Sequence, residues 1–196
     1  REARAAGERV GAEYITWEFP DGELQASLDV RRAIIREVRA FAPDLVITHR
    51  TNDYHPDHRA VGVSVQDASY MVTVPNICPD VAALKRDPVV SSMVDLFTRP
   101  APLRPDVVLD ISTEFDVAVQ MAACHESQFY QWLPYHDGCL HTIPSEPSER
   151  FAWLANCFRS LHAQRRQHFS PALVSCGLPL DSDGAVELFE VSEYAR

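Results

Sequence analysis

A continuous apolar run, DLVIT at residues 44–48, constrains the fold of this chain more than any other feature. Such a run is typical of a parallel strand that is buried on both faces. It is followed by a polar loop, RTNDYHPD, and then by a helical pattern that begins near Asp57. A strand, a polar loop and a helix in this order indicate an α/β fold, in which functional groups collect at the carboxyl ends of the strands.

The rest of the chain supplies further strands and helices. Alternating or apolar segments predict strands at 13–19, 106–111 and 185–191, and apolar residues at helical spacing predict helices at 1–10, 29–41, 113–133 and 148–168. Residues 75–105 contain six prolines, so we expect an irregular excursion or lid there, with one short helix or strand near 91–97. We predict a single three-layer α/β domain over residues 1–196, with a mostly parallel, Rossmann-like sheet.

Composition excludes several classes of partner. The chain of 196 residues has 18 basic and 28 acidic residues, a formal charge of −10, which disfavours nucleic acid. We find no basic amphipathic helix and no apolar stretch as long as a membrane span. Five scattered cysteines form no C-x-x-C pair, which favours buried free thiols and a cytoplasmic location. The sequence leaves homo-oligomer formation open.

The polar loop carries the chemistry of greatest interest. His55 and His58 lie three positions apart near a predicted helix start, so both can reach one site. Pro56 suits the first helical turn, and Asp53 or Asp57 could orient an imidazole through its second nitrogen. A catalytic zinc site needs three protein ligands, so two histidines do not complete one. A polar loop without a metal remains the alternative, whereas a serine hydrolase is disfavoured because no G-x-S-x-G is present.

Three segments in order resemble the LmbE-like, or PIG-L, family of zinc-dependent N-deacetylases. They are REARAAGERVGAEYITWEFPDGEL, PDLVITHRTNDYHPDHRAVG and DISTEFDVAVQMAACHESQ, and the H-P-D-H segment is the most specific. The resemblance implies a hydrolase that removes an N-acetyl or other N-acyl group from an amino sugar, such as an N-acetylglucosamine conjugate. It also implies one Zn²⁺ ion in each active site.

The resemblance assigns roles to individual residues. His58 would be the zinc ligand, and His55 would act on the reacting amide by stabilising the oxyanion or protonating the leaving amine. Asp57 would orient a ligand, and Asp53 or Tyr54 would line the substrate site. Two further histidines remain open from the residues alone. His49 follows a strand and is a candidate for supporting the site, whereas His125 is either a helix-end histidine or a site residue.

The chain departs from the family pattern in one respect. The family signature H-P-D-D-E, which supplies the other zinc ligands and the general base, is absent from residues 1–54. We therefore expect it in an upstream portion of the protein. The alternatives are an inactive relative that binds a sugar and an N-deacylase of an acylated natural product. Trp132, Tyr135 and His136 are candidates either for a sugar-stacking wall or for packing under a loop.

Overall fold

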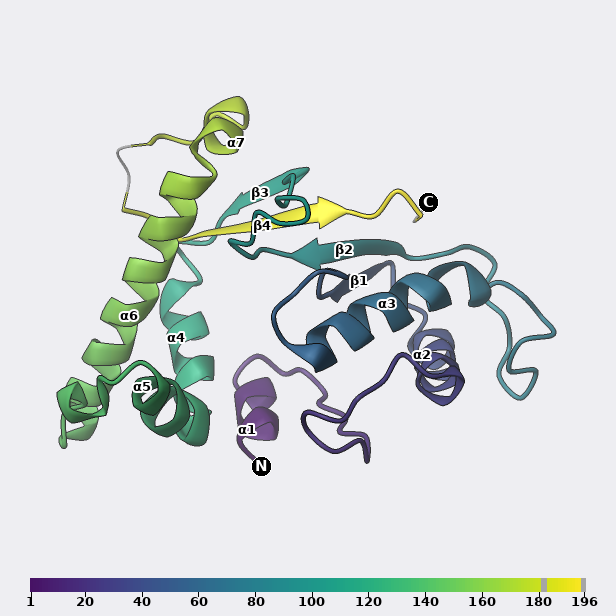
Figure 1. Ribbon diagram of the computed structural model, residues 1–196, viewed down its shortest axis with the longest axis horizontal. Coiled ribbons are helices and arrows are strands. Elements are labelled where there is room, and N and C mark those ends of the chain that lie inside the picture. Colours follow the sequence, from purple (N-terminus) through teal and green to yellow (C-terminus); the bar gives the residue numbers. More distant parts are fainter. Residues whose placement is uncertain (181–182, 195–196) are drawn as a thin grey trace. The chain divides into compact units, whose positions relative to one another are not determined.

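The structure is a computed structural model that describes residues 1–180 and 183–194 (Figure 1). Its contacts divide the chain into two compact units. Unit 1 comprises residues 1–17 and 109–187, and unit 2 comprises residues 18–108 and 188–196. The H-P-D-H loop lies in unit 2. The interpretation of residues 1–196 as a single domain stays a prediction.

A four-stranded sheet has the order β1-β2-β4-β3. Its strands are β1 (Leu45–Thr48), β2 (Val89–Met93), β3 (Val107–Asp110) and β4 (Val186–Val191). β1 pairs with β2 in parallel, with Leu45 opposite Val89, whereas β2 pairs with β4 in the antiparallel sense. The α/β class is therefore confirmed, and the sheet is mixed.

Helices α2 (Leu28–Phe41) and α3 (Pro56–Met71) pack against each other on one side of the β1–β2 pair (Figure 1). α2 begins where the Ser27 hydroxyl accepts a hydrogen bond from the Val30 backbone N–H, as an N-cap residue does. Its buried face carries Val30, Ile34 and Ile35, of which Ile35 is fully buried. This apolar face anchors the helix pair beneath the loop that leaves β1.

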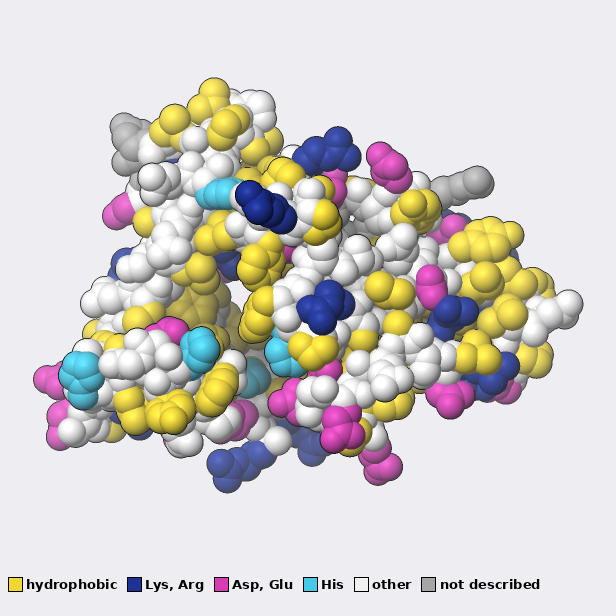
Figure 2. Space-filling model, viewed as in Figure 1, with side chains coloured by type: hydrophobic (Ala, Val, Ile, Leu, Met, Phe, Trp, Pro, Cys, Tyr) yellow, Lys and Arg dark blue, Asp and Glu magenta, His cyan; other side chains and the backbone are white. Residues whose placement is uncertain are grey.

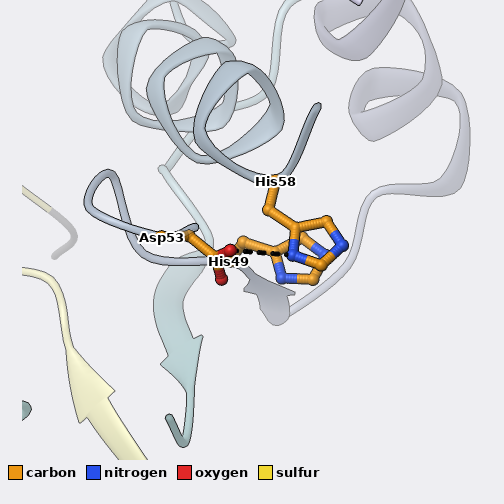
Figure 3. Close-up of side chains that lie close together, drawn as sticks. All are labelled: His49, Asp53 and His58. Carbon is orange, nitrogen blue, oxygen red and sulfur yellow. Dashed lines mark hydrogen bonds and ion pairs between the residues drawn. The ribbon is translucent and has the colours of Figure 1, made fainter. Parts of the chain in front are cut away.

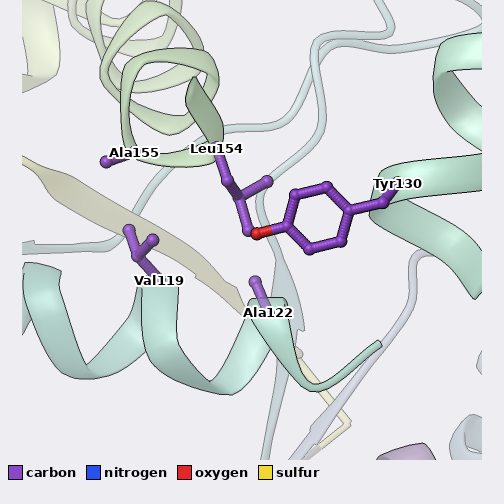
Figure 4. Close-up of a cluster of buried hydrophobic side chains, with 5 residues drawn as sticks. All are labelled: Val119, Ala122, Tyr130, Leu154 and Ala155. Carbon is purple, nitrogen blue, oxygen red and sulfur yellow. The ribbon is translucent and has the colours of Figure 1, made fainter. Parts of the chain in front are cut away.

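Unit 1 is mainly helical. Its helices are α1 (Glu2–Glu8), α4 (Phe115–Ala123), a π-helix (Gln128–Trp132), α5 (Leu133–His136), a 3₁₀ helix (Leu140–Thr142), α6 (Pro147–His168) and α7 (Ser170–Ser175). α4 packs against α6 around a core of Val119, Ala122, Tyr130, Leu154 and Ala155 (Figure 4). The core explains why the helices predicted at 113–133 and 148–168 form, although the first of them is interrupted after Ala123.

Most predicted elements are present, and one is wrong. Strands at 44–48, 106–111 and 185–191 correspond to β1, β3 and β4, and the short element expected near 91–97 is β2. Residues 13–19 form no strand. A strand requires a neighbour that pairs with its backbone, and β-branched composition alone does not provide one.

The distribution of charged residues, membrane-spanning helices and cysteines can be compared with what the sequence predicted. Acidic and basic side chains are interspersed over the face drawn in Figure 2. Among the described residues, no helix combines the length and apolarity that crossing a membrane requires. The five cysteines are free thiols, as expected. Only Cys78 is buried, however, so the expectation that they are all buried is wrong.

Candidate metal centre

The start of α3 is built by the H-P-D-H residues themselves. The imidazole of His55 caps the helix, because its Nδ1 accepts a hydrogen bond of 3.2 Å from the Asp57 backbone N–H. Pro56 occupies the first helical position. A backbone N–H there would have no partner within the helix, so proline loses no hydrogen bond. With Nδ1 acting as an acceptor, the Nε2 of the neutral His55 ring carries the proton and is the donor.

The Asp57 carboxylate bonds to the backbone that precedes α2. It accepts backbone hydrogen bonds from Gly22 at 2.7 Å and Leu24 at 3.2 Å. It thereby ties the F-P-D-G turn to the first turn of α3. Orienting a metal ligand through Asp57 stays a prediction, since both of these bonds serve the turn.

Asp53 holds the two histidines of the loop. Its Oδ1 accepts the His55 backbone N–H at 2.8 Å and lies 3.1 Å from Nδ1 of His58. The Asp53 side chain is 9% exposed. From α3, the Arg59 guanidinium donates to the carbonyls of Asp53 and Tyr54 at 2.6 and 2.9 Å. The loop is therefore fixed at its side chains and at its backbone.

His49, Asp53 and His58 converge at the carboxyl end of β1 (Figure 3). One candidate ligand atom from each residue lies within 4.8 Å of the other two. The imidazole rings of His49 and His58 are stacked, with centroids 4.0 Å apart and planes 2° from parallel. We call these three residues the metal cluster.

The stacking limits how the cluster could bind an ion. An imidazole nitrogen ligates through a lone pair in the plane of its ring. The lone pairs of His49 and His58 therefore lie in parallel planes and do not meet at one point unless a ring rotates. His58 can ligate without such a rotation, because Asp53 contacts its Nδ1 and leaves Nε2 available. A carboxylate on the second nitrogen is the usual support of a metal-bound histidine.

The surroundings of His49 disfavour its protonated form. Burial lowers the pKa of His49 below its ordinary value, and the neighbouring His58 lowers it further, while the Asp53 carboxylate acts in the opposite direction. A neutral imidazole keeps the lone pair that a metal requires. Two imidazoles and one carboxylate form a donor set that suits zinc, which is commonly held by three protein ligands in catalytic sites. The residue types therefore fit zinc.

The other predicted site residues lie in different surroundings. Tyr54 is 70% exposed, and its ring meets those of His55 and His58 edge-on at 5.8 and 5.7 Å. A position beside the cluster suits a residue that lines a substrate site. His125 follows α4 in unit 1, where its carbonyl accepts the backbone N–H of Phe129. Its role in the site stays a prediction.

The aromatic group in unit 1 is exposed. Trp132 and Tyr135 are 53% and 68% exposed, and the Trp132 ring lies 5.8 Å from that of His136. Packing under a loop, one of the two interpretations, does not describe side chains this open to solvent. The sugar-stacking interpretation stays a prediction.

Two residues that position the cluster, Arg50 and Gly62, were not marked by any motif or pattern in the sequence. Arg50 is 7% exposed, and its guanidinium donates to the Asp95 carboxylate at 3.1 Å and to the Ala101 carbonyl at 2.8 Å. Gly62 lets α3 approach the chain after β1, since a Cβ there would lie 2.7 Å from the Arg50 carbonyl oxygen and 2.8 Å from that of His49. Only the tertiary structure shows that both residues support the loop.

Comparison with known proteins bears on this loop directly. Residues 1–69 match the PIG-L family, described as GlcNAc-PI de-N-acetylase. This part of the chain is therefore similar to the PIG-L family. The PIG-L segment contains the whole metal cluster and Gly62, so the resemblance expected from H-P-D-H is confirmed.

A curated relative extends the similarity beyond the PIG-L segment. The chain is 27% identical over 143 residues to diacetylchitobiose deacetylase of Thermococcus kodakarensis. The matched region is 68% of this chain and 52% of that protein, so the chain spans about half the length of this relative.

Solved structures share the fold. N,N′-diacetylchitobiose deacetylase of Pyrococcus horikoshii matches with a TM-score of 0.66 at 17% identity, covering 98% of this chain and 62% of its own. The 4-carboxy-2-hydroxymuconate hydratase GalB of Pseudomonas putida matches with a TM-score of 0.64 at 17% identity, covering 97% and 69%. One of these proteins is named a deacetylase and the other a hydratase. The shared fold therefore does not decide the reaction, which has to be inferred from the residues of the site.

Proposed function

We propose that this chain carries the H-P-D-H site of a zinc-dependent N-deacetylase that acts on an acetylated amino sugar. The observation that carries the proposal is the metal cluster of His49, Asp53 and His58 within the PIG-L segment. The naming of the similar Thermococcus and Pyrococcus proteins as diacetylchitobiose deacetylases supports a substrate of the N-acetylglucosamine type. A cytoplasmic location remains part of the proposal.

The reaction is the hydrolysis of an amide. A water oxygen bonds to the acetyl carbon, the C–N bond breaks, and the leaving nitrogen takes a proton, so that acetate and a free amine result. When bound, zinc acts as a Lewis acid toward the carbonyl and lowers the pKa of water. The general base belongs, by the family resemblance, to the H-P-D-D-E signature, which residues 1–54 do not contain.

His58 and His55 would have different roles in the reaction. His58 would hold zinc through Nε2, with Asp53 on its Nδ1 keeping the ring in one orientation. His55 would donate from Nε2 to the oxygen on which negative charge develops, a contact that strengthens in the transition state. Its Nδ1 is already committed to the helix cap, which orients the ring for that donation. Tyr54 would flank the acyl group.

The test measures released amine and acetate together. The zinc-loaded protein, produced from its complete reading frame, is incubated with N-acetylglucosamine and N,N′-diacetylchitobiose, with His58→Ala as the control. We expect equal amounts of amine and acetate from the wild type and a loss of both in the variant. Absence of amine from every acylated amino sugar at full zinc occupancy would refute the proposal.

Two alternatives give distinct results in the same assay. An inactive relative would bind the sugar and release no amine at any zinc concentration. An N-deacylase would release amine faster from substrates with longer acyl chains than from acetylated ones. β2 lies inside residues 75–105, so that segment is partly sheet and only its remainder is available to shape an acyl pocket.

A further inference from the structure

A polar pocket lies in unit 2 beside the loop that carries the metal cluster. Its volume is about 520 Å³, within the usual range of small-molecule sites. Residues Arg50, Thr51 and Asn52 form one wall, and they are the residues between His49 and Asp53 of the cluster. The pocket and the cluster therefore share a continuous piece of chain.

The charges of the lining disfavour strongly anionic ligands. Arg50 and Arg104 face the pocket together with Asp106, Glu190 and Glu193, which gives two positive and three negative groups, or a net charge of −1. A phosphate or nucleotide would meet this excess of negative charge. A neutral ligand rich in hydroxyl groups would meet no such penalty.

Several of these charged groups form the frame of the pocket. Glu190 accepts a hydrogen bond from the Arg104 backbone N–H at 3.3 Å, and its carboxylate lies 3.7 Å from the Arg50 guanidinium. The Asp106 carboxylate accepts the Val191 backbone N–H at 2.8 Å. These bonds hold the end of β4 against the segment that precedes β3. The Glu190 and Asp106 carboxylates are therefore occupied in building the pocket.

Three other side chains are available to a ligand. The Gln66 amide, the Ser92 hydroxyl and the Arg104 guanidinium line the pocket, and none has a hydrogen-bond or ion-pair partner within residues 1–180 and 183–194. They come from α3, from β2 and from the chain before β3. Donors and acceptors that converge from three elements on one polar space are the pattern of a site that orients a ligand.

We infer that this pocket binds a neutral saccharide unit, namely the sugar next to the one that loses its acetyl group. The inference rests on the proposed function, because it assigns this sugar to the same substrate. Gln66, Ser92 and Arg104 would hydrogen-bond to its hydroxyl or acetamido groups. Tyr194, which is 64% exposed, offers an aromatic ring at the rim.

The first experiment measures binding without zinc. N,N′-diacetylchitobiose is titrated into the protein in EDTA, and the dissociation constant is followed by NMR shifts. We expect Gln66→Leu and Ser92→Ala each to weaken binding by about 2- to 13-fold, the range of one neutral hydrogen bond. Arg104→Met should weaken it by at least as much. Arg86→Met, which removes an exposed guanidinium outside the pocket, should leave it unchanged.

Several results of this binding experiment would overturn the inference. Absence of saturable binding, binding that is unaffected by all three pocket variants, or tighter binding of inorganic phosphate than of the disaccharide would each overturn the inference. Equal weakening in the Arg86→Met control would show a general charge effect and would also overturn it.

A kinetic measurement separates this inference from the proposed function. If the protein is a deacetylase, Gln66→Leu should raise KM for the disaccharide and leave kcat and the KM for N-acetylglucosamine unchanged. Amine release with an unaltered disaccharide KM would refute the pocket alone. Pocket-dependent sugar binding without amine release would refute the deacetylase proposal alone.

Discussion

At the scale of single residues, His55 and His58 are close in sequence and differ in their contacts. His55 Nδ1 is bonded to the backbone of its own helix, whereas His58 Nδ1 faces the Asp53 carboxylate. Their ring centroids lie 4.7 Å apart. The two rings therefore offer different free nitrogens to one region, and their loss should have different consequences.

Replacing His58 should strongly weaken metal binding. We expect His58→Ala to weaken zinc affinity by well over 100-fold, more than the 10–100-fold that the loss of a supporting partner causes. Activity should fall with it and recover in part at high zinc. Zinc titration with a competing chelator, followed by turnover measurements, checks both effects. Normal zinc affinity in this variant would remove His58 from the ligand set.

Replacing His55 should affect turnover and leave zinc binding near the wild-type value. Alanine would also remove the cap of α3, at a cost of about 1 kcal/mol in stability. His55→Asn is the better variant, because asparagine is a favourable N-cap residue and lacks the outward Nε2–H. We expect kcat to fall by roughly 10²–10³, as for a lost oxyanion donor. Zinc loss equal to that of His58→Ala would show that His55 is a ligand.

Asp53 distinguishes a supporting carboxylate from a direct ligand. If Asp53 only orients His58 through Nδ1, Asp53→Asn should reduce zinc affinity by about 10–100-fold. The amide oxygen can still accept the His55 backbone N–H, so the loop should keep its conformation. A loss as large as that of His58→Ala, measured in the same titration, would place Asp53 among the ligands instead.

At the scale of elements, α3 can approach the chain after β1 only because residue 62 is glycine. Alanine favours helix interiors over glycine by about 1 kcal/mol, yet here its Cβ would meet backbone oxygens that cannot move aside. Overpacking of this kind costs about 1–3 kcal/mol. We expect Gly62→Ala to lower the free energy of unfolding by up to about 2 kcal/mol in urea titrations.

A matched control for Gly62→Ala lies two residues away on α3. Ser64 is 1% exposed, and its hydroxyl has no hydrogen-bond partner among the described residues. Ser64→Ala removes that unsatisfied group and adds helix propensity, so stability should be unchanged or higher. Zinc affinity should fall in Gly62→Ala, because the shift displaces His58, and should stay constant in Ser64→Ala. Equal zinc affinity in both variants would contradict this role of Gly62.

At the scale of the whole molecule, a buried histidine should make folding depend on pH. His162 of α6 is 3% exposed, and its Nδ1 lies 3.1 Å from the Val186 carbonyl oxygen. Burial lowers the pKa of His162, and the neighbouring Arg165 lowers it further, while the Val186 backbone contact raises it.

The sign of the effect follows from proton binding. As the pH falls below about 6.5, the unfolded state binds a proton at residue 162 before the folded state does. The free energy of unfolding is therefore highest above that pH and should decrease as the pH falls. Urea unfolding at pH 7.5 and pH 5.5 should show a larger loss in the wild type than in His162→Asn. Identical losses would assign the pH dependence to other groups.

The sequence alone determined those features that repeat locally along the chain. The apolar patterns placed α2, β1 and α6 within one or two residues of their observed bounds. A helix that is buried on one side repeats apolar residues about every 3.6 positions, and a strand that is buried on both faces is apolar throughout. H-P-D-H identified the candidate functional loop, since proline and an N-cap side chain dictate how α3 starts. The pattern of residue types was therefore enough to single out His55, His58 and Asp53.

Only the tertiary structure decided which distant groups meet. Residues 13–19 have strand composition and form no strand, because backbone pairing depends on a neighbour that composition does not specify. The stack of His49 on His58 depends on how closely α3 approaches the end of β1, which Gly62 permits. Arg50 reaches Asp95, 45 residues away in sequence. Such contacts depend on how distant segments pack together. Local sequence patterns do not specify the distances between residues that are far apart in the sequence.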